Sequence, residues 1–295
     1  MKAGPFFTSL SNRALEFSDM KWQTSRFEID LQRPRVMGIV NVTPDSFSDG
    51  GQHAQARQAI LHCQRLVEEG ADILDIGGES SRPGAVRLSE AAEWARVEPV
   101  LREAVSLGLP VSIDTCKPEL MCRALDLGVD IVNDIQALRA EGALKAVQTH
   151  PKAGVCLMHM RGDSSNMQGL VDYEDVVTEV SSFLADRAAL VRAAGVAADR
   201  IVLDPGYGFA KTTEQNFQLL ARQSEMLGLG FPLLVGWSRK RALGDVTGRP
   251  VEQRLPASLA AALAALSRGA RILRVHDVAA TVDALKVWQA IAAAA

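Results

Sequence analysis

The chain has 295 residues, with 32 Lys and Arg against 35 Asp and Glu and a formal net charge of −3. Its shares of 47% hydrophobic and 23% charged residues are those of a globular protein and exclude long disorder. A near-neutral charge without a basic block argues against nucleic acid or an anionic membrane as the main partner. The length favours either two average domains or one α/β barrel of about 250 residues.

The cysteines predict a reducing compartment. There are four, without a CxxC pair: Cys63, Cys116, Cys122 and Cys156. We expect free thiols. The first residues lack the pattern of a signal peptide, and no stretch reaches the roughly 18 apolar residues of a membrane span. We therefore expect a cytoplasmic protein.

One pattern recurs along the chain, in which a short apolar run ends in polar or glycine residues and an amphipathic helical stretch follows. Such runs are typical of parallel strands that are buried on both faces. Their ends lie about 34 residues apart on average, the length of one βα unit. The eight runs are Val36–Thr43, Ile73–Gly78, Pro110–Thr115, Ile131–Ile135, Gly154–Met160, Ile201–Gly206, Pro232–Ser238 and Ile272–Val278.

Helical segments are expected between these runs, among them Gln55–Gly70, Ser89–Gly108 and Glu174–Gly195. Several segments end in glycine, a common left-handed helix stop. The glycines in question are Gly70, Gly108, Gly128, Gly195 and Gly269.

Eight βα units predict a single (β/α)8 barrel, the TIM barrel. A doubly wound open sheet is the competing fold, but the usual glycine-rich turn after its first strand is missing. We expect residues 1–25 to form a short N-terminal extension and residues 26–295 to form the barrel domain. Within the domain, Arg26–Leu31 is expected to form a small strand that covers the barrel bottom.

Polar residues follow the predicted strands, at the end of a barrel where active sites lie. A single polar residue there is more often a helix cap than a ligand. All eight strands end in this way, however, which predicts a functional site. The residues are Asn41, Asp75, Glu79, Asp114, Asn133, Asp134, His159, Asp204, Ser238, Lys240, Arg274 and His276.

The last strand predicts an anion site. Arg274 and His276 are two residues apart and point the same way on a strand, and Asp277 is placed to cap the next helix. Cationic groups beside a helix N-terminus favour phosphate, which barrels often bind at these loops. The alternative is that Arg274 pairs with an acid inside the barrel.

Four other residues suit a flat heterocycle with amide and amine edges: Asp114, Asn133, Asp204 and Lys240. Carboxylates accept parallel N–H bonds from such an edge, and lysine donates to its acceptors. The alternatives are a solvated Lys240 and a turn-forming Asp204.

Nearby residues are expected to contact the two faces of the ring. Gly206 and Gly208 allow a ring to approach the backbone. Met158 and Phe209 are placed to sandwich the ring, with core packing as the alternative.

Two long polar loops, Asn41–Gly51 and Gly77–Ala85, are expected to order over substrate, although simple connections are the alternative. Neither loop carries HExxH or a cysteine cluster. Asn41 is a neutral oxygen ligand that suits Mg²⁺ shared with a pyrophosphate.

The assembled motifs resemble those of the dihydropteroate synthases, pterin-binding enzymes of folate biosynthesis that sulfonamides inhibit. The resemblance runs from about Gly38 to Asp277. It rests on MGIVNVTPDSFSDGG (37–51), DIGGESSRPGA (75–85), SIDT (112–115), VNDI (132–135), LDPGYGF (203–209), VGWSRK (235–240) and RVHD (274–277).

The resemblance implies a role for each site residue. Pterin is bound by Asp114, Asn133, Met158, Asp204, Phe209 and Lys240. Pyrophosphate is bound by Asn41, Arg274 and His276, and Asn41 also meets the Mg²⁺ cofactor. p-Aminobenzoate is bound by Phe47, Ser81, Arg82, Phe209 and Ser238. Asp114, Lys240 and Arg274 carry the catalysis. The chain departs from the family at Ser81, where threonine is common, and at Ala210, where glycine is common.

The implied reaction joins 6-hydroxymethyl-7,8-dihydropterin pyrophosphate to p-aminobenzoate by an SN1-like loss of pyrophosphate. A methyltetrahydrofolate-type methyltransferase is one alternative, and a non-catalytic pterin-binding barrel is another. The resemblance also implies a homodimer, for which the alanine-rich segments Leu255–Ala265 and Ala279–Ala294 offer a packing face.

Overall fold

A computed structural model describes residues 20–43, 52–80, 87–163 and 165–294. Of residues 52 and 53 it describes only the backbone. Three predicted site residues, Phe47, Ser81 and Arg82, lie outside the described residues.

The predicted barrel is confirmed. Over the described ranges, eight parallel strands close in the order β10-β3-β4-β5-β6-β7-β8-β9. Each overlaps one predicted apolar run. Their bounds are β3 (Arg35–Asn41), β4 (Ile73–Gly77), β5 (Val111–Asp114), β6 (Ile131–Asp134), β7 (Gly154–Met158), β8 (Ile201–Asp204), β9 (Leu233–Val235) and β10 (Ala270–Val275).

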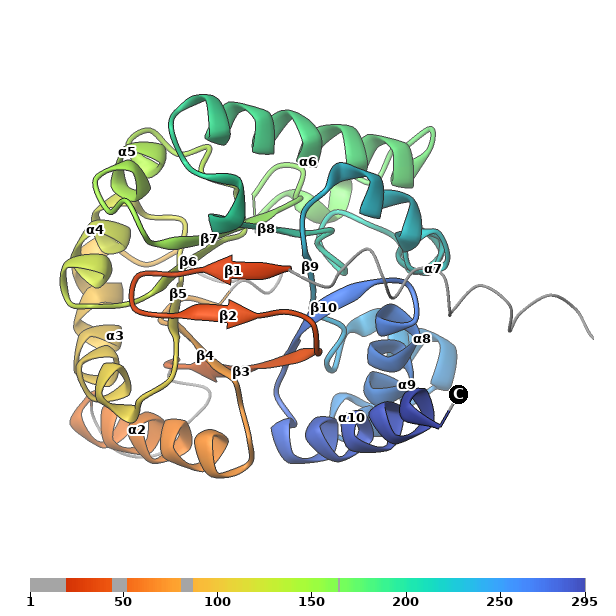
Figure 1. Ribbon diagram of the computed structural model, residues 1–295, viewed down its shortest axis with the longest axis horizontal. Helices are drawn as coiled ribbons and strands as arrows, with labels where there is room; N and C mark the ends of the chain where they lie inside the picture. Colours follow the sequence, from red (N-terminus) through yellow and green to blue (C-terminus); the bar gives the residue numbers. More distant parts are fainter. Residues whose placement is uncertain (1–19, 44–51, 81–86, 164, 295) are drawn as a thin grey trace, which may run out of the picture.

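Helices surround the barrel, as Figure 1 shows. They are α2 (Gln52–Glu68), α3 (Glu90–Ala104), α4 (Pro118–Asp126), α5 (Ala143–Gln148), α6 (Val176–Ala193), α7 (Thr213–Ala221), α8 (Arg241–Thr247), α9 (Leu255–Leu266) and α10 (Val278–Ala293). Short 3-10 turns occur at Val105–Leu107, Met167–Gly169, Ala198–Arg200, Gln223–Leu229 and Val251–Gln253. The five predicted glycine stops all have positive φ, between 80° and 103°. Among the described helices, none is long and apolar enough to cross a membrane.

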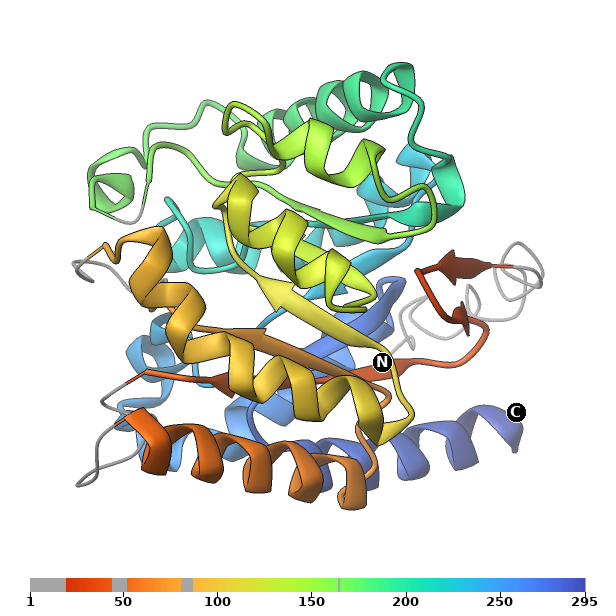
Figure 2. The same ribbon diagram turned by 90° about the vertical axis from the view of Figure 1, so that its left-hand side faces the viewer.

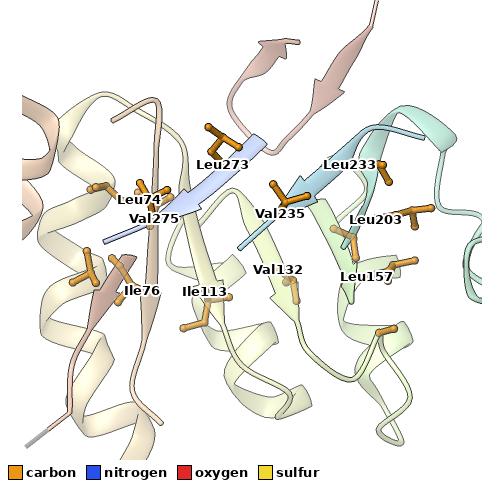
Figure 3. Packing of buried hydrophobic residues seen from close by; sticks show 14 of the residues in the cluster. Leu74, Ile76, Ile113, Val132, Leu157, Leu203, Leu233, Val235, Leu273 and Val275 are labelled. Atoms are coloured by element: carbon orange, nitrogen blue, oxygen red, sulfur yellow. The ribbon is translucent and has the colours of Figure 1, made fainter. Parts of the chain in front are cut away.

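Side chains alternate between the two faces of the barrel wall. Outward positions carry aliphatic residues that pack under the helices, as Figure 3 shows. Those labelled in the figure are Leu74, Ile76, Ile113, Val132, Leu157, Leu203, Leu233, Val235, Leu273 and Val275. Because side chains on a strand alternate with a period of two, the residues between them point into the barrel.

A hairpin closes the barrel at the N-terminal ends of the strands. It pairs β1 (Lys21–Gln23) with β2 (Glu28–Asp30) in antiparallel register, and Figure 2 shows it at one end of the strands. The predicted small strand at Arg26–Leu31 is therefore confirmed, but its partner β1 was not expected. The domain boundary predicted at residue 25 falls between the two strands of this hairpin.

Trp22 is the centre of this closure. Its side chain is 0% exposed, and its indole Nε1 donates a hydrogen bond to the carbonyl oxygen of Arg200 at 2.9 Å. It packs on the inward residues nearest the barrel bottom, which are Met37, Ile73, Ile131, Cys156, Val202, Leu234 and Ile272. The hairpin thus seals the apolar end of the barrel and leaves the opposite end for polar groups.

We expect Trp22→Ala to lower the melting temperature by about 10 °C, because truncating a buried tryptophan costs about 3–5 kcal/mol. Trp22→Phe, which keeps most of the apolar contact and loses the hydrogen bond, should lower it by less. Thermal unfolding followed by circular dichroism measures both variants. A shift below 2 °C for Trp22→Ala would contradict this role of the hairpin.

Candidate active site

Polar side chains gather inside the barrel at the C-terminal ends of the strands. Because side chains alternate along each strand of the barrel wall, one set of polar side chains points into the barrel. This set consists of Asn41, Asp75, Asp114, Asn133, Asp204 and Arg274. The next residue on β6, Asp134, points outward for the same reason. The carboxylate of Asp134 accepts hydrogen bonds from the backbone N–H groups of Gln136 and Leu138, both at 2.7 Å. Asp134 therefore shapes the loop after β6 and is not part of the interior cluster.

Arg274 lies between two carboxylates of this cluster. Its Nε donates to Asp75 Oδ2 and its Nη2 donates to Asp114 Oδ2, each at 2.6 Å. The ion pair with acids inside the barrel, which was the alternative for Arg274, is thus the arrangement in the structure. The side chain is still 20% exposed, and its other N–H groups donate to no described residue. They are available to an anion.

The pKa values of two site residues lie close to neutrality. Burial raises the pKa of Asp114 to about 7, against the opposing effect of Arg274. Burial lowers the pKa of Lys240 to about 8, against the attraction of Asp204. Perturbed groups of this kind, gathered at one end of a barrel, are typical of active sites.

Lys240 lies over an aromatic ring. Its Nζ is 4.2 Å from the centroid of Phe209, within the range of a cation–π interaction. The backbone of Gly208 has φ of +81°, and a Cβ added there would lie 3.0 Å from Lys240 Cδ. Glycine at this position therefore lets the lysine stem lie along the loop. Lys240 is therefore partly buried and is not the solvated lysine of the alternative interpretation.

Asp204 forms the turn that was its alternative role. Its Oδ1 accepts a hydrogen bond from the backbone N–H of Gly206 at 2.7 Å. A Cβ on Gly206 would lie 2.0 Å from the carbonyl oxygen of His159, so only glycine fits there. Burial raises the pKa of Asp204, which remains close enough to Lys240 for the two to attract each other.

Lys211 is a buried amine beside the site that was not among the predicted residues, and burial lowers its pKa to about 7. Its Nζ donates to His159 Nδ1 and to the carbonyl oxygens of Gly206 and Phe209, each at 3.0 Å. These acceptors match the three N–H groups of an ammonium. Lys211 therefore secures the loop that carries Phe209. Its position directly after LDPGYGFA was the signal available in the sequence.

Met158 and Phe209 pack into a small apolar cluster with Met160, Met167 and Ala210. Core packing, the alternative for both, is thus present, although Phe209 also touches Lys240. Ala210 has φ of +48°, a left-handed conformation that costs alanine about 1 kcal/mol. Its buried methyl group recovers about 0.8 kcal/mol. This balance explains how alanine stands where glycine is common.

His276, a predicted anion residue after the last strand, contacts Ser238, which follows β9. Ser238 Oγ lies 3.0 Å from His276 Nδ1 and accepts the backbone N–H of His276 at 3.2 Å. Burial lowers the pKa of His276 to about 3, so its imidazole is neutral. Asp277 takes the predicted N-cap position of α10, but its side chain makes no capping hydrogen bond. Its carboxylate instead pairs with Arg239 through two hydrogen bonds, at 2.6 and 3.0 Å.

A second buried network lies beside the ends of the loop after β4. Lys117 donates to Glu79 at 2.6 Å and also to Glu93, which is 1% exposed. Glu79 in turn accepts the backbone N–H of Leu88 at 2.8 Å. The network thereby joins the loop ends to α3 and to the start of α4. Of these residues, only Glu79 was a predicted site residue.

Asn41 is the predicted metal ligand, and it ends β3 with its side chain partly exposed. Within the described ranges, no group of three or more His, Cys, Asp or Glu residues is arranged to hold a metal ion. One neutral amide oxygen fits Mg²⁺, because this ion usually keeps several waters and shares substrate phosphates.

The sequence matches known proteins over most of its length. The family described as pterin binding enzyme matches residues 37–276. Dihydropteroate synthase of Neisseria meningitidis serogroup C is 53% identical, over 92% of this chain and 97% of that protein. The enzyme of Escherichia coli strain K12 is 44% identical, over 92% and 96%.

The comparison with solved structures indicates the same family. Dihydropteroate synthase of Xanthomonas albilineans with 4-aminobenzoic acid superposes with a TM-score of 0.88 at 51% identity, covering 94% of this chain and 99% of that one. The chain therefore belongs to the pterin-binding enzyme family, among the dihydropteroate synthases. Its members transfer alkyl groups.

The buried histidine next to Lys211 predicts a pH dependence of stability. Burial lowers the pKa of His159 to about 2, from 6.5 in an unfolded chain. The stabilisation by a group with a lowered pKa is present above pH 6.5 and is lost as the pH falls toward 2.

When the pH falls from 7.5 to 5.5, His159 becomes protonated in the unfolded chain but not in the folded one. We expect this difference to lower the free energy of unfolding by about 1.4 kcal/mol. His159→Gln retains an acceptor for Lys211 and should remove this part of the pH dependence. Urea unfolding at the two pH values measures the difference. An equal pH dependence in the variant and the wild type would contradict a neutral, buried His159.

Proposed function

We propose that this chain catalyses the dihydropteroate synthase reaction, the condensation of 6-hydroxymethyl-7,8-dihydropterin pyrophosphate with p-aminobenzoate. The observation that carries the proposal is the interior cluster of carboxylates, amide and cations, in a chain about half identical to dihydropteroate synthases along nearly its whole length. One structure of the Xanthomonas enzyme is a complex with 7,8-dihydropteroate, the product of this reaction.

In this proposal, the pterin ring binds inside the mouth of the barrel. Asp114, Asp204 and Asn133 accept or donate hydrogen bonds along its amide and amine edge, and Lys240 donates to a ring acceptor. Met158 and Phe209 contact the faces of the ring. The contact between Lys240 and Phe209 supports the proposal, because it already holds the ammonium beside the ring pocket.

The pyrophosphate binds toward Arg274, His276 and Asn41. The unused N–H groups of Arg274 donate to the leaving group, and the neutral His276 donates from its ring nitrogen. Asn41 and substrate oxygens would hold Mg²⁺, which would supply positive charge against the leaving pyrophosphate.

The C–O bond to pyrophosphate breaks first, and the electron-rich dihydropterin stabilises the cationic methylene. The amine of p-aminobenzoate then forms the new C–N bond and releases a proton. Asp114 stabilises the positive charge that develops on the ring, since it is held beside the pocket by Arg274. Asp114, Lys240 and Arg274 therefore carry the catalysis.

p-Aminobenzoate binds against Ser238 and Phe209 in this proposal, with Phe47, Ser81 and Arg82 from the two long loops. A Yersinia pestis dihydropteroate synthase has been solved with a sulfonamide drug. We accordingly propose that sulfonamides compete for the p-aminobenzoate site of this chain.

We further propose a cytoplasmic homodimer, with a barrel unit at residues 26–295 and a short extension at 1–25, whose segment Lys21–Gln23 completes the hairpin that closes the barrel. The four cysteines are free, which supports a reducing compartment. The outer face of α10 supports a second copy as partner, because Val287 and Ile291 are more than 60% exposed there.

The function is tested by measuring pyrophosphate release from the dihydropterin pyrophosphate with and without p-aminobenzoate. We expect release that depends on p-aminobenzoate, with dihydropteroate formed in equal amount. Methyl transfer from methyltetrahydrofolate without such release would instead favour the methyltransferase. Pterin binding with neither reaction would favour a non-catalytic barrel.

We expect Asp204→Asn to weaken pterin binding by about 2 kcal/mol, roughly 30-fold, because a charge-assisted hydrogen bond is lost. Calorimetry with 6-hydroxymethylpterin measures this affinity. Asp199→Asn is the matched control, since Asp199 is exposed just before the other end of the same strand. Equal affinity in Asp204→Asn and the control would contradict the pterin role of Asp204.

A further inference from the structure

Asp75 is a wholly buried carboxylate that contacts two residues of the proposed site. It is 0% exposed within β4. Its Oδ2 accepts hydrogen bonds from Arg274 Nε at 2.6 Å and from Asn133 Nδ2 at 3.1 Å. These partners belong to β10 and β6, neither of which neighbours β4 in the barrel. One carboxylate therefore joins three separated strands beneath the pocket.

The contact with Asp75 fixes the orientation of the Asn133 amide. The Asp75 oxygen that pairs with Arg274 also accepts from Nδ2 of Asn133, so the NH₂ group of Asn133 faces Asp75. The carbonyl oxygen Oδ1 is then on the other side of the amide, and no described residue donates to it. Asn133 consequently presents an acceptor to a ligand, whereas an unrestrained amide presents either a donor or an acceptor.

Asp75 also fixes the guanidinium of Arg274. With Nε on Asp75 and Nη2 on Asp114, the planar group has two anchors and cannot rotate freely. The arginine thereby stays beside Asp114, and its remaining N–H groups keep one direction.

The second carboxylate oxygen of Asp75 indicates that Asp75 does more than stabilise the fold. Asp75 Oδ1 is buried and has no hydrogen-bond partner among the described residues. A buried acceptor without a partner destabilises the fold, and such groups in native proteins commonly serve a site.

We propose that Asp75 is a positioning residue that sets the hydrogen-bonding specificity of the ring pocket, by making Asn133 an acceptor and holding Arg274 beside Asp114. The inference rests on the proposed function, because it takes the pocket to bind a pterin. It assigns Asp75 no contact with the substrate.

The first test compares Asp75→Asn with wild type by calorimetry with 6-hydroxymethylpterin and by steady-state kinetics. We expect pterin affinity to fall about tenfold or more. The KM for p-aminobenzoate should stay within about twofold of wild type, since the change acts on the pterin pocket. Pterin affinity within about twofold of wild type in folded Asp75→Asn would overturn the proposal.

Asp72→Asn is the matched control. Asp72 directly precedes the same strand, and its carboxylate pairs with Arg33 and Arg35, both at 2.9 Å, and accepts the backbone N–H of Val36. It lies at the barrel end opposite the pocket. We expect a lower melting temperature with unchanged pterin affinity. An equal loss of affinity in the control would show a general structural effect and overturn the proposal.

A reciprocal exchange decides the question if Asp75→Asn does not fold. Asn133→Asp alone sets two carboxylates against each other and should lose pterin binding. Asp75→Asn combined with Asn133→Asp restores the pair, because the new amide at position 75 donates to the new carboxylate and leaves its second oxygen as an acceptor. We expect the double variant to bind pterin about tenfold more tightly than Asn133→Asp. No recovery would overturn the proposal.

These measurements separate the inference from the function on which it rests. Calorimetry uses neither p-aminobenzoate nor turnover. A wild-type chain that binds pterin without releasing pyrophosphate would therefore contradict the proposed reaction, while the affinities of the variants would still decide the role of Asp75.

Discussion

The closed parallel barrel imposes one constraint from which the rest of the molecule follows. Each strand alternates its side chains between the helices and the interior, and closure directs all interior side chains toward one axis. Near the hairpin these side chains are apolar and are sealed by Trp22. At the other end they are carboxylates, an amide and an arginine. The polar groups therefore meet at a single site although they come from distant parts of the chain.

A consequence of this convergence is a high density of buried charge. Arg274 stabilises two carboxylates, and Lys211 is stabilised by an imidazole and two carbonyl oxygens. Burial brings the pKa values of Asp114 and Lys240 near neutrality, against the effect of the opposite charges beside them. Buried groups of this kind interact strongly with an incoming polar ring or anion, because charges in a protein interior are screened less than in bulk water.

Stability and binding use the same side chains here. Asp204 forms a turn with Gly206 and is also a proposed pterin ligand, and Ser238 holds His276 while lining the proposed p-aminobenzoate site. The alternatives considered for Arg274 and Asp204 are therefore compatible with their proposed roles. An ion pair or a turn hydrogen bond holds the side chain in place and leaves other atoms available for a ligand.

The sequence by itself determined the barrel, the strand positions and the family, because regularly spaced, near-continuous apolar runs and long motifs are local features. It also selected Asp114, Asn133, Asp204, Lys240 and Arg274 as neighbours, since strand ends must converge in a barrel. Only the tertiary structure decided the direction and the partners of each side chain. It turned Asp134 outward, paired Asp277 with Arg239, and revealed Lys211 and the central position of Asp75. Apart from the local contacts of Asp134, these outcomes depend on contacts between residues up to 199 positions apart, which no local pattern contains.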